Sequence, residues 1–332
     1  IKSAHQMGIG TVAIYTDPDA NSPYVREAKE AFKLDSSYLD AKKIIEIASN
    51  ANVDAIHPGY GFLSENSNFA NLVSKSNIKW VGPSANAIKK MGDKLTAKKL
   101  SEKASVPTLP MTSDPKEAKK IGYPLLIKAA AGGGGKGMRI VKSQKDLKES
   151  IASAQREAEG GFGDKRVFIE RYIAKSRHIE IQILGDSYGN IVHLGERECS
   201  IQRRHQKVVE ESPSPVVDEE LRNKMGAAAI KIASLLKYES AGTVEFLFDE
   251  KTKEFWFLEV NTRLQVEHPV TEEVTGIDLV REQLKIANGD PLDFSQEEIE
   301  WFGSSIEVRL YSEDPGNNFL PVTGKLIAFE PT

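Results

Sequence analysis

The sequence predicts a multidomain protein that combines the α/β and α+β classes, and three observations lead to this prediction. In the first quarter, short apolar strands alternate with amphipathic helices, which is typical of a mostly parallel sheet. Between residues 123 and 141, a block of glycines separates two apolar runs. From residue 167 onward, long apolar strands joined by polar turns predict an antiparallel sheet.

Length and composition exclude several classes of protein. The chain has 332 residues, enough for about two or three domains, and its net charge of −4 gives no general attraction to nucleic acid or anionic lipid. The single cysteine, Cys199, excludes a disulfide framework within the chain and a cysteine-rich metal site. No apolar segment approaches the roughly 20 residues that span a bilayer. We therefore expect a soluble protein of the cytoplasm, or of the mitochondrial matrix in a eukaryote.

The N-terminal α/β domain is expected over residues 1–83. Its expected elements are a helix ending near residue 7, a strand at 11–15, a helix at 40–50, a strand at 53–56, a helix at 66–76 and a strand at 79–81. Because the chain opens on the end of a helix, we expect that the first strand of this domain is missing. The loop 57–66, which begins with His57, follows the carboxyl end of a strand, where open α/β sheets bind ligands. A structural role for His57 is the alternative.

A helical connector and a lid follow. The connector is expected over 84–107, with helices at 84–90 and 93–103, and the lid over 108–173. In the lid, the glycines turn a hairpin between strands at 125–127 and 138–141, and a helix follows at 144–159. Glycines carry no Cβ, so their backbone amides can close on an anion, for which phosphate is the natural candidate. A flexible surface loop is the alternative interpretation.

Three familiar phosphate-binding motifs do not fit this hairpin. Lys136 is followed by Gly137 instead of the Ser or Thr of a P-loop. Gly132, Gly134 and Gly137 have the spacing of a dinucleotide-binding loop, but a strand follows them instead of a helix. The catalytic motifs of protein kinases are absent from the downstream sequence. What remains is a glycine hairpin that closes over a nucleotide, with Lys128 at the end of its first strand.

The rest of the chain is expected to form a large subdomain over 174–303 and the start of a β-rich C-terminal domain over 304–332. A strand at 167–173 ends the lid, and the expected elements after it are strands at 178–184, 191–196, 206–210, 243–248, 254–260, 305–310 and 325–329, and a helix at 218–236. A basic cluster at 203–207 is either a solvated hairpin end or, beside a magnesium–phosphate site, an anion-binding wall.

Alternating polar residues after the strand at 254–260 carry the strongest chemical signal. They are Glu259, Asn261, Arg263, Gln265 and Glu267. In an extended chain they share one face. Glu259 and Asn261, together with Glu245 on the neighbouring strand, offer the oxygen ligands that Mg²⁺ prefers. The arginine and glutamine can hold a small planar anion, which places Glu267 as a general base. A half-exposed edge strand is the alternative interpretation.

Several stretches together resemble the ATP-grasp superfamily and, more closely, the biotin carboxylases. They are residues 57–66, 91–94, the glycine hairpin, 177–182, 198–207 and 259–272, in the order of that family and over essentially the whole chain. The resemblance implies an ATP-grasp fold preceded by a Rossmann-like pre-ATP-grasp domain. It also implies a ligase that uses ATP and bicarbonate to carboxylate biotin on a carrier protein or domain, through carboxyphosphate.

The resemblance further implies the residues of the site. ATP would be bound by Lys94, Lys128, Gly133, Gly134, Gly135, Gly137, Met138, Glu170, Arg171, Tyr172, Ile173, His178, Gln202, His205 and Leu247. Magnesium or manganese would be bound by Glu245, Glu259 and Asn261. Bicarbonate and biotin would be bound by Lys207, Arg263, Gln265, Val266, Glu267 and Arg309. Of these, Lys207, Arg263, Glu267 and Arg309 would be catalytic, with Glu267 taking the bicarbonate proton and Arg309 stabilising the biotin enolate.

The implied partners are a biotinyl carrier, a carboxyltransferase and a second copy of the full-length chain, without nucleic acid or membrane. The acyl-CoA or keto acid that finally receives the carboxyl group is not specified, and acetyl-CoA carboxylase of fatty acid biosynthesis is one setting. Lys136 stands where many relatives have arginine, which keeps the charge but loses the bidentate geometry. We expect the chain to be part of a longer enzyme. Another ATP-grasp ligase, such as a carbamoyl phosphate synthetase-like enzyme, and a non-catalytic nucleotide-binding module are the alternatives.

Overall fold

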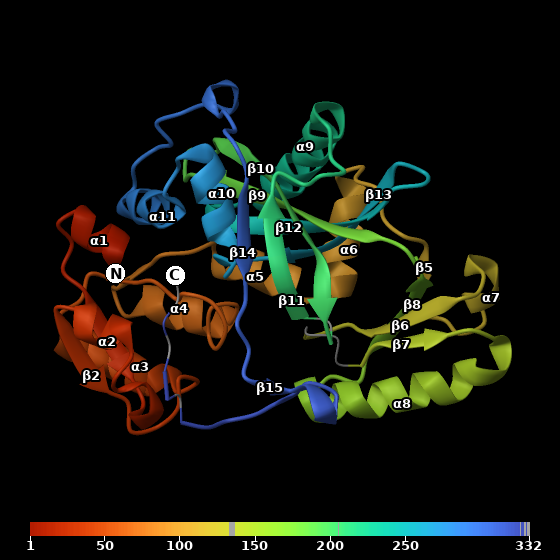
Figure 1. Cartoon of the computed structure of the whole chain (residues 1–332), viewed down its shortest axis with the longest axis horizontal. Coiled ribbons are helices and arrows are strands. Elements are labelled where there is room, and N and C mark those ends of the chain that lie inside the picture. The colour runs from red at the N-terminus through yellow and green to blue at the C-terminus, as the bar shows by residue number, and fades with distance from the viewer. Residues whose placement is uncertain (133–136, 205, 326, 329, 331–332) are drawn as a thin grey trace.

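The computed structural model describes residues 1–132, 137–204, 206–325, 327–328 and 330. It has an N-terminal α/β region, a small four-stranded sheet and a large six-stranded sheet (Figure 1). The large sheet lies between the other two regions, with the N-terminal region on the left of Figure 1 in red and the small sheet on the right in yellow. The described part of the chain contains no helix that is both long and apolar enough to cross a bilayer.

The N-terminal region contains two parallel strand pairs that share one hydrophobic core. Strand β1 (Val12–Tyr15) pairs with β2 (Glu30–Lys33), and β3 (Ala55–Ile56) pairs with β4 (Lys79–Trp80). The helices are α1 (Lys2–Gln6), α2 (Pro23–Glu27), α3 (Ala41–Asn50) and α4 (Ser67–Lys75), with a 3₁₀ helix η1 (Asp17–Asp19). The parallel pairing was predicted, but a single sheet was not found, because the strands are short and no described strand bridges the two pairs. Neither α2 nor β2 was predicted.

Two helices connect this region to the small sheet, and their start residues are set by side-chain caps. Helix α5 (Ala85–Gly92) begins after Ser84, and α6 (Lys94–Lys103) begins after Asp93. The Oδ1 atom of Asp93 accepts a hydrogen bond of 2.8 Å from the backbone amide of Thr96. Such a cap satisfies an amide that the helix itself leaves unpaired. Both predicted helices are confirmed, and Lys94 is the first residue of α6.

The small sheet is the expected glycine hairpin with two additional strands. Strands β5 (Met111–Thr112), β6 (Leu125–Ala129), β7 (Arg139–Val141) and β8 (Val167–Arg171) are ordered β5-β8-β6-β7, and every pair is antiparallel. Helices α7 (Ala118–Ile121) and α8 (Gln144–Phe162) are also present. Leu125, Ile127 and Ile169 form a core with Leu147 and Ala154 of α8. The apolar side of the sheet therefore packs on this helix.

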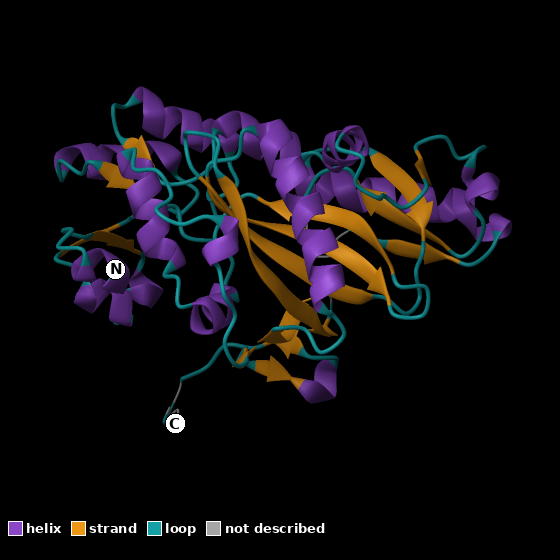
Figure 2. Ribbon diagram, turned by 90° about the horizontal axis from the view of Figure 1, so that it is seen from above, coloured by secondary structure: helices purple, strands orange, loops and turns teal. Residues whose placement is uncertain are grey.

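The large sheet is antiparallel throughout and has the order β13-β12-β9-β10-β11-β14. Its strands are β9 (Arg177–Gly185), β10 (Ile191–Arg203), β11 (Gln206–Ser212), β12 (Ser240–Asp249), β13 (Glu254–Asn261) and β14 (Ser305–Val308). Figure 2 shows helices lying across these strands. The core between them joins Ile179, Ile181 and Ile183 of β9 to Ile232 of α9 (Glu219–Leu236). The side chains of His178, Glu180 and Gln182 alternate with these isoleucines and so belong to the other face.

The expected strands of the large sheet are confirmed, and β10 continues seven residues further than predicted. The extended segment expected over 259–267 is wrong in its second half: β13 ends at Asn261, and Glu267 precedes helix α10 (His268–Thr275). Helix α11 (Leu279–Asn288) follows, and neither helix was predicted. Two of the residues expected in a strand at 325–329 lie outside the described residues, and the other three are not in a strand. Instead, β15 (Glu313–Asp314) pairs with β16 (Leu320–Pro321). The remaining 3₁₀ helices are η2 (Gln296–Glu298) and η3 (Pro315–Asn317).

Candidate active site

A cavity of about 640 Å³ lies on the polar face of the large sheet. It is bounded by β12 and β13, by the loop 262–267, by the β10–β11 hairpin, by the start of α6 and by the loop 60–65. The sequence-predicted site residues in its lining are Lys94, His178, Gln202, Lys207, Glu245, Glu259, Asn261, Arg263, Gln265, Val266, Glu267 and Arg309. Residues separated by more than 200 positions in the sequence thus meet in one cavity.

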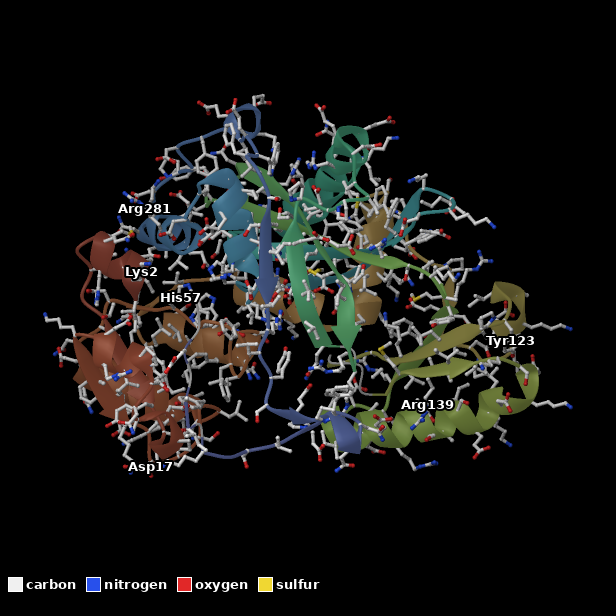
Figure 3. The ribbon with its side chains drawn as sticks, in the orientation of Figure 1. Lys2, Asp17, His57, Tyr123, Arg139 and Arg281 are labelled. Carbon is white, nitrogen blue, oxygen red and sulfur yellow. The ribbon has the colours of Figure 1, made fainter. Side chains whose placement is uncertain are left out.

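The other predicted site residues are not part of this lining. Lys128, Gly137, Met138, Glu170, Arg171, Tyr172, Ile173 and Leu247 lie outside it, and Gly133, Gly134, Gly135 and His205 lie outside the described residues. His57 also lies elsewhere, between the N-terminal region and α11 (Figure 3). Its Nε2 atom is 3.0 Å from Oε1 of Gln283. This contact agrees with the structural alternative for His57.

The polar side chains of the loop 262–267 reach the cavity although β13 ends before them. Leu264 is buried in the apolar core beside α11 and anchors the middle of the loop. Arg263 and Gln265, on either side of it, line the cavity. The Nε of Arg263 donates to Glu65 at 3.0 Å, which fixes the guanidinium from the N-terminal region. The alternation was therefore informative about burial even where the strand prediction was wrong.

Among the carboxylates that line the cavity, Glu245 has the most hydrogen-bonding partners in the described part of the chain. Its Oε1 accepts hydrogen bonds from Asn261 at 2.7 Å, from Lys207 at 3.1 Å and from Gln265 at 3.2 Å, and its Oε2 lies 2.8 Å from Nε2 of His178. Burial opposes ionisation of Glu245, but the Lys207 and His178 charges outweigh it and hold the pKa well below the usual range. Burial likewise opposes protonation of His178, and the Glu245 charge raises the pKa of the imidazole.

Glu267 lies between two cations. Its Oε1 accepts from Nζ of Lys207 at 2.6 Å, and its Oε2 accepts from Nη2 of Arg309 at 2.8 Å. Burial opposes ionisation, but Lys207 and Arg197 lower the pKa of Glu267 to about 2. The carboxylate is therefore ionised throughout the neutral range. The surrounding acids, Glu180 and Glu245 first, raise the pKa of Lys207 well above its ordinary value although burial opposes this.

A fully buried arginine behind the cavity was not predicted. Arg197 donates to Glu180 at 2.6 Å and to Gln182 at 2.8 Å. It also donates to the hydroxyls of Thr271 at 2.9 Å and Thr243 at 3.1 Å. Because β9 alternates polar and apolar residues over 178–183, Glu180 and Gln182 could have been placed with His178 from the sequence.

The donor set fits a divalent cation at the β12–β13 pair. Glu245 and Glu259 are directly opposite each other in the strand register, and both line the cavity with Asn261. Two carboxylates and an amide oxygen suit Mg²⁺ or Mn²⁺, which also takes ligands from substrate phosphates. Another close group, Glu180 with Cys199 and Glu267, fits less well, because burial raises the pKa of the Cys199 thiol well above its ordinary value and so disfavours the thiolate that binds a metal.

Two family models match the chain. "Biotin carboxylase, N-terminal domain" covers residues 1–88, and "Carbamoyl-phosphate synthase L chain, ATP binding domain" covers residues 89–295. Biotin carboxylase 1 of Bacillus subtilis is 47% identical over 100% of this chain and 76% of that protein. The propionyl-CoA carboxylase alpha chain of Ruegeria pomeroyi is 50% identical over 100% of this chain and 50% of that protein. The chain thus spans half the length of the second relative.

Solved structures give the same result. The biotin carboxylase domain of Hydrogenobacter thermophilus 2-oxoglutarate carboxylase, a dimer in complex with MgADP, ADP and bicarbonate, has a TM-score of 0.93 and 45% identity, over 96% of this chain and 73% of that chain. Biotin carboxylase from Campylobacter jejuni has a TM-score of 0.92 and 46% identity, over 96% of this chain and 74% of that chain.

Fold and cavity together define an ATP-grasp protein with a preceding α/β domain, as predicted. Within that class, the chain belongs to the biotin carboxylase family. The resemblance drawn from the sequence motifs is thereby confirmed.

Proposed function

We propose that this chain performs the biotin carboxylase half-reaction of a biotin-dependent carboxylase. In that reaction, ATP and bicarbonate carboxylate biotin on a carrier protein or domain, through a carboxyphosphate intermediate. The observation that carries the proposal is the position of Glu267 between Lys207 and Arg309, in the same cavity as the Glu245–Glu259 pair. A base, two cations and a pair of metal-type carboxylates are the groups that such a reaction requires.

Activation of bicarbonate is assigned to Glu267. With a pKa of about 2, its carboxylate is a weak base while Lys207 and Arg309 contact it. An anion that enters between these groups would contact the two cations itself. The pKa of Glu267 would then rise toward its ordinary value, because fewer positive charges would stabilise its ionised form. Entry of bicarbonate would thus make Glu267 a better base for the bicarbonate proton.

Binding of ATP is assigned to the start of α6 and to the lid. Lys94 is the first residue of this helix, lines the cavity and has its Nζ 3.3 Å from Oε2 of Glu259. A helix N-terminus and a lysine together favour phosphate. Glu245, Glu259 and Asn261 would hold the magnesium ion, which neutralises phosphate charge when bound. Lys128 would contact the phosphates from the lid, which would also exclude water from carboxyphosphate.

Transfer to biotin is assigned to Arg309. It follows β14, and two acidic residues hold it: Glu267 at 2.8 Å from Nη2 and Glu210 at 2.7 Å from Nε. A guanidinium so fixed can stabilise the negative charge that develops on the biotin ureido oxygen. As partners we propose a biotinyl carrier, a carboxyltransferase and a second copy of the chain, the last on the analogy of the dimer in the Hydrogenobacter structure.

A second candidate function is that of a carbamoyl phosphate synthetase-like ligase. The family model over residues 89–295, which is named after carbamoyl-phosphate synthase, favours it. The two functions share the phosphorylation of bicarbonate and differ in the acceptor of the carboxyl group. Measuring bicarbonate-dependent ATP cleavage by the full-length protein separates them. Stimulation by free biotin is expected, whereas stimulation by ammonia alone would reject the proposed function.

A further inference from the structure

Two lysines share one buried glutamate between α6 and the small sheet of strands β5 to β8, here called the lid sheet. Lys128 of β6 donates to Oε1 of Glu170 at 3.0 Å, and Lys98 of α6 donates to Oε2 of the same carboxylate at 2.8 Å. Both ammonium groups lie within 6 Å of the Phe168 ring centroid, at 5.8 and 5.9 Å. Each oxygen of Glu170 thus has its own cation, and the aromatic ring contacts both.

The strand register explains why these groups meet. Lys128 is opposite Phe168, and Leu126 is opposite Glu170, so all four side chains belong to one face of the lid sheet. The other face packs on α8. Lys98 comes from α6, one helical turn after Lys94, which lines the cavity. Residues four apart lie on the same face of a helix. Along this face of α6, the first lysine lies at the cavity and the second lies at the lid sheet.

With both lysines ionised, the cluster carries one more positive charge than negative, and burial, together with the Lys128 charge, lowers the pKa of Lys98. The three ionisable side chains are almost entirely buried: Lys98 is 4% exposed, Lys128 is 5% exposed and Glu170 is 4% exposed. Although burial opposes ionisation of Glu170, the two lysines lower its pKa, so the carboxylate is charged. A buried group of two cations and one anion is poorly compensated by itself. An additional anion would complete it.

If Lys128 were the only partner of Glu170, an anion that recruited Lys128 would leave a buried carboxylate unpaired. Such a step is strongly unfavourable, because breaking a buried pair exposes the remaining charge to the apolar interior. Lys98 removes this obstacle, since it can hold Glu170 alone. Glu102, the other acid near Lys98, is exposed and contacts Thr108 at 3.3 Å, so it does not replace Glu170 as the partner of Lys98.

We propose that Lys98 is a positioning residue for nucleotide binding, which keeps Glu170 paired when Lys128 contacts the phosphates of ATP. The inference rests on the proposed function, in which Lys128 binds these phosphates. Lys98 itself touches neither substrate nor metal. Its effect on affinity passes through Glu170, and this sets it apart from a lysine that only supports packing.

The test uses the full-length protein and five variants. They are Lys98→Met, Lys98→Arg, Lys99→Met, Glu170→Gln and the double variant Lys98→Met with Glu170→Gln. Calorimetry gives the Kd for MgADP, and steady-state kinetics give the KM values for MgATP and bicarbonate. Lys99 is the matched control, because it is the exposed neighbour of Lys98 on the same helix.

We expect Lys98→Met to weaken MgADP and MgATP binding by about tenfold or more, the size of a lost charge-assisted contact. Lys98→Arg should retain most of the affinity, and Lys99→Met should retain all of it. The KM for bicarbonate should stay constant in each. In the Glu170→Gln background, removal of Lys98 should change the nucleotide affinity little, because no carboxylate then competes for Lys128.

Equal losses from Lys98→Met in the two backgrounds would overturn the inference, as would no loss in either. If Lys98→Met does not fold, the inference is tested by comparing the MgADP affinity of the double variant with that of Glu170→Gln. A much weaker affinity in the double variant would contradict the mechanism. If the variants contradict the role of Lys98 but the wild-type protein shows bicarbonate-dependent ATP cleavage, the inference is rejected and the proposed function stands. A wild-type protein that binds no MgADP would overturn the proposed function and the inference with it.

Discussion

The Lys207 ammonium donates to Glu267 at 2.6 Å and thereby ties the β10–β11 hairpin to the start of α10. Lys207 also donates to Glu245 at 3.1 Å, so one cation connects the proposed general base with the proposed metal ligands. Because these groups share charges, a change at one of them alters the pKa of the others. The proposed bicarbonate and nucleotide sites are therefore electrostatically coupled.

Replacing the proposed base tests its role without changing its size. In Glu267→Gln, the side chain can no longer accept a proton, so kcat for bicarbonate-dependent ATP cleavage should fall by roughly 10²- to 10⁴-fold. The Kd for MgADP should change little, since Glu259 and Asn261 are untouched. Steady-state kinetics and calorimetry measure the two quantities. Turnover equal to that of the wild type would contradict the assignment.

The metal ligands predict a shift in magnesium dependence. Glu259→Gln removes one of two opposed carboxylates, so the Mg²⁺ concentration for half-maximal ATP cleavage should rise by about tenfold or more. Chelation of the metal should abolish cleavage in the wild type. Glu254→Gln, on an exposed position of the same strand, is the control and should keep the wild-type magnesium requirement. An unchanged requirement in both variants would remove Glu259 from the metal site.

A side chain added at Gly132, just before the glycine-rich segment, is expected to reduce turnover. Gly132 has φ of +80°, and a Cβ there would lie 2.1 Å from the ring of Phe162 at the end of α8. Gly132→Ala should therefore force the backbone at Gly132 or the Phe162 ring to move, and so reduce kcat/KM for MgATP. Gly160→Ala is the control, because a Cβ at that helical position meets nothing within 4 Å. Equal kinetics in the two variants would show that the conformation at Gly132 does not matter.

The buried Glu210 predicts a pH dependence of stability. Burial raises its pKa from 4.5 to about 7, with only partial compensation by Arg309. Its folded-state pKa lies above the unfolded value, so between pH 4.5 and 7 the unfolded chain ionises first and this residue destabilises the fold as the pH rises. Glu210→Gln cannot ionise. Relative to the wild type, it should gain up to roughly 3 kcal/mol between pH 4.5 and 8.

Urea unfolding of the two proteins across this pH range measures the difference. The conservative Glu307→Gln on the facing strand serves as a comparison, because the pKa of Glu307 is also raised by burial and the residue is paired in register with Glu210. A difference between Glu210→Gln and the wild type that is independent of pH would contradict the account, and so would one that falls as the pH rises.

Most elements of the fold were predictable because their signals are local. The alternation of Ile179, Ile181 and Ile183 identifies β9, and the caps at Asp93 and Asp218 mark the starts of α6 and α9. Helix α10 was missed because the polar alternation continues up to Glu267 and favours a strand. Helix α11 was missed although its Asp278 cap and the helical spacing of its buried residues are local signals. The way the N-terminal strands pair was not predictable from local pattern, because it depends on contacts between distant segments.

Most residues of the cavity could be identified from the sequence, but the contacts between their side chains could not. Glu245, Glu259 and Glu267 stand in patterned segments, whereas Glu65 reaches Arg263 from a loop almost 200 positions earlier. Lys98 lies in a helix with several other lysines, and composition cannot separate a buried one from its solvated neighbours. Its role depends on Glu170, and only the packed structure places the two residues in contact.

The central claim is that bicarbonate is phosphorylated by ATP in the cavity around Glu267. The most direct measurement supplies ¹⁸O-labelled bicarbonate to the full-length protein with MgATP and biotin and follows the label into inorganic phosphate. Attack of a bicarbonate oxygen on the γ-phosphate predicts one labelled oxygen in each phosphate released, in step with carboxybiotin formation. Phosphate that carries no label, released at the same rate with or without bicarbonate, would contradict the account.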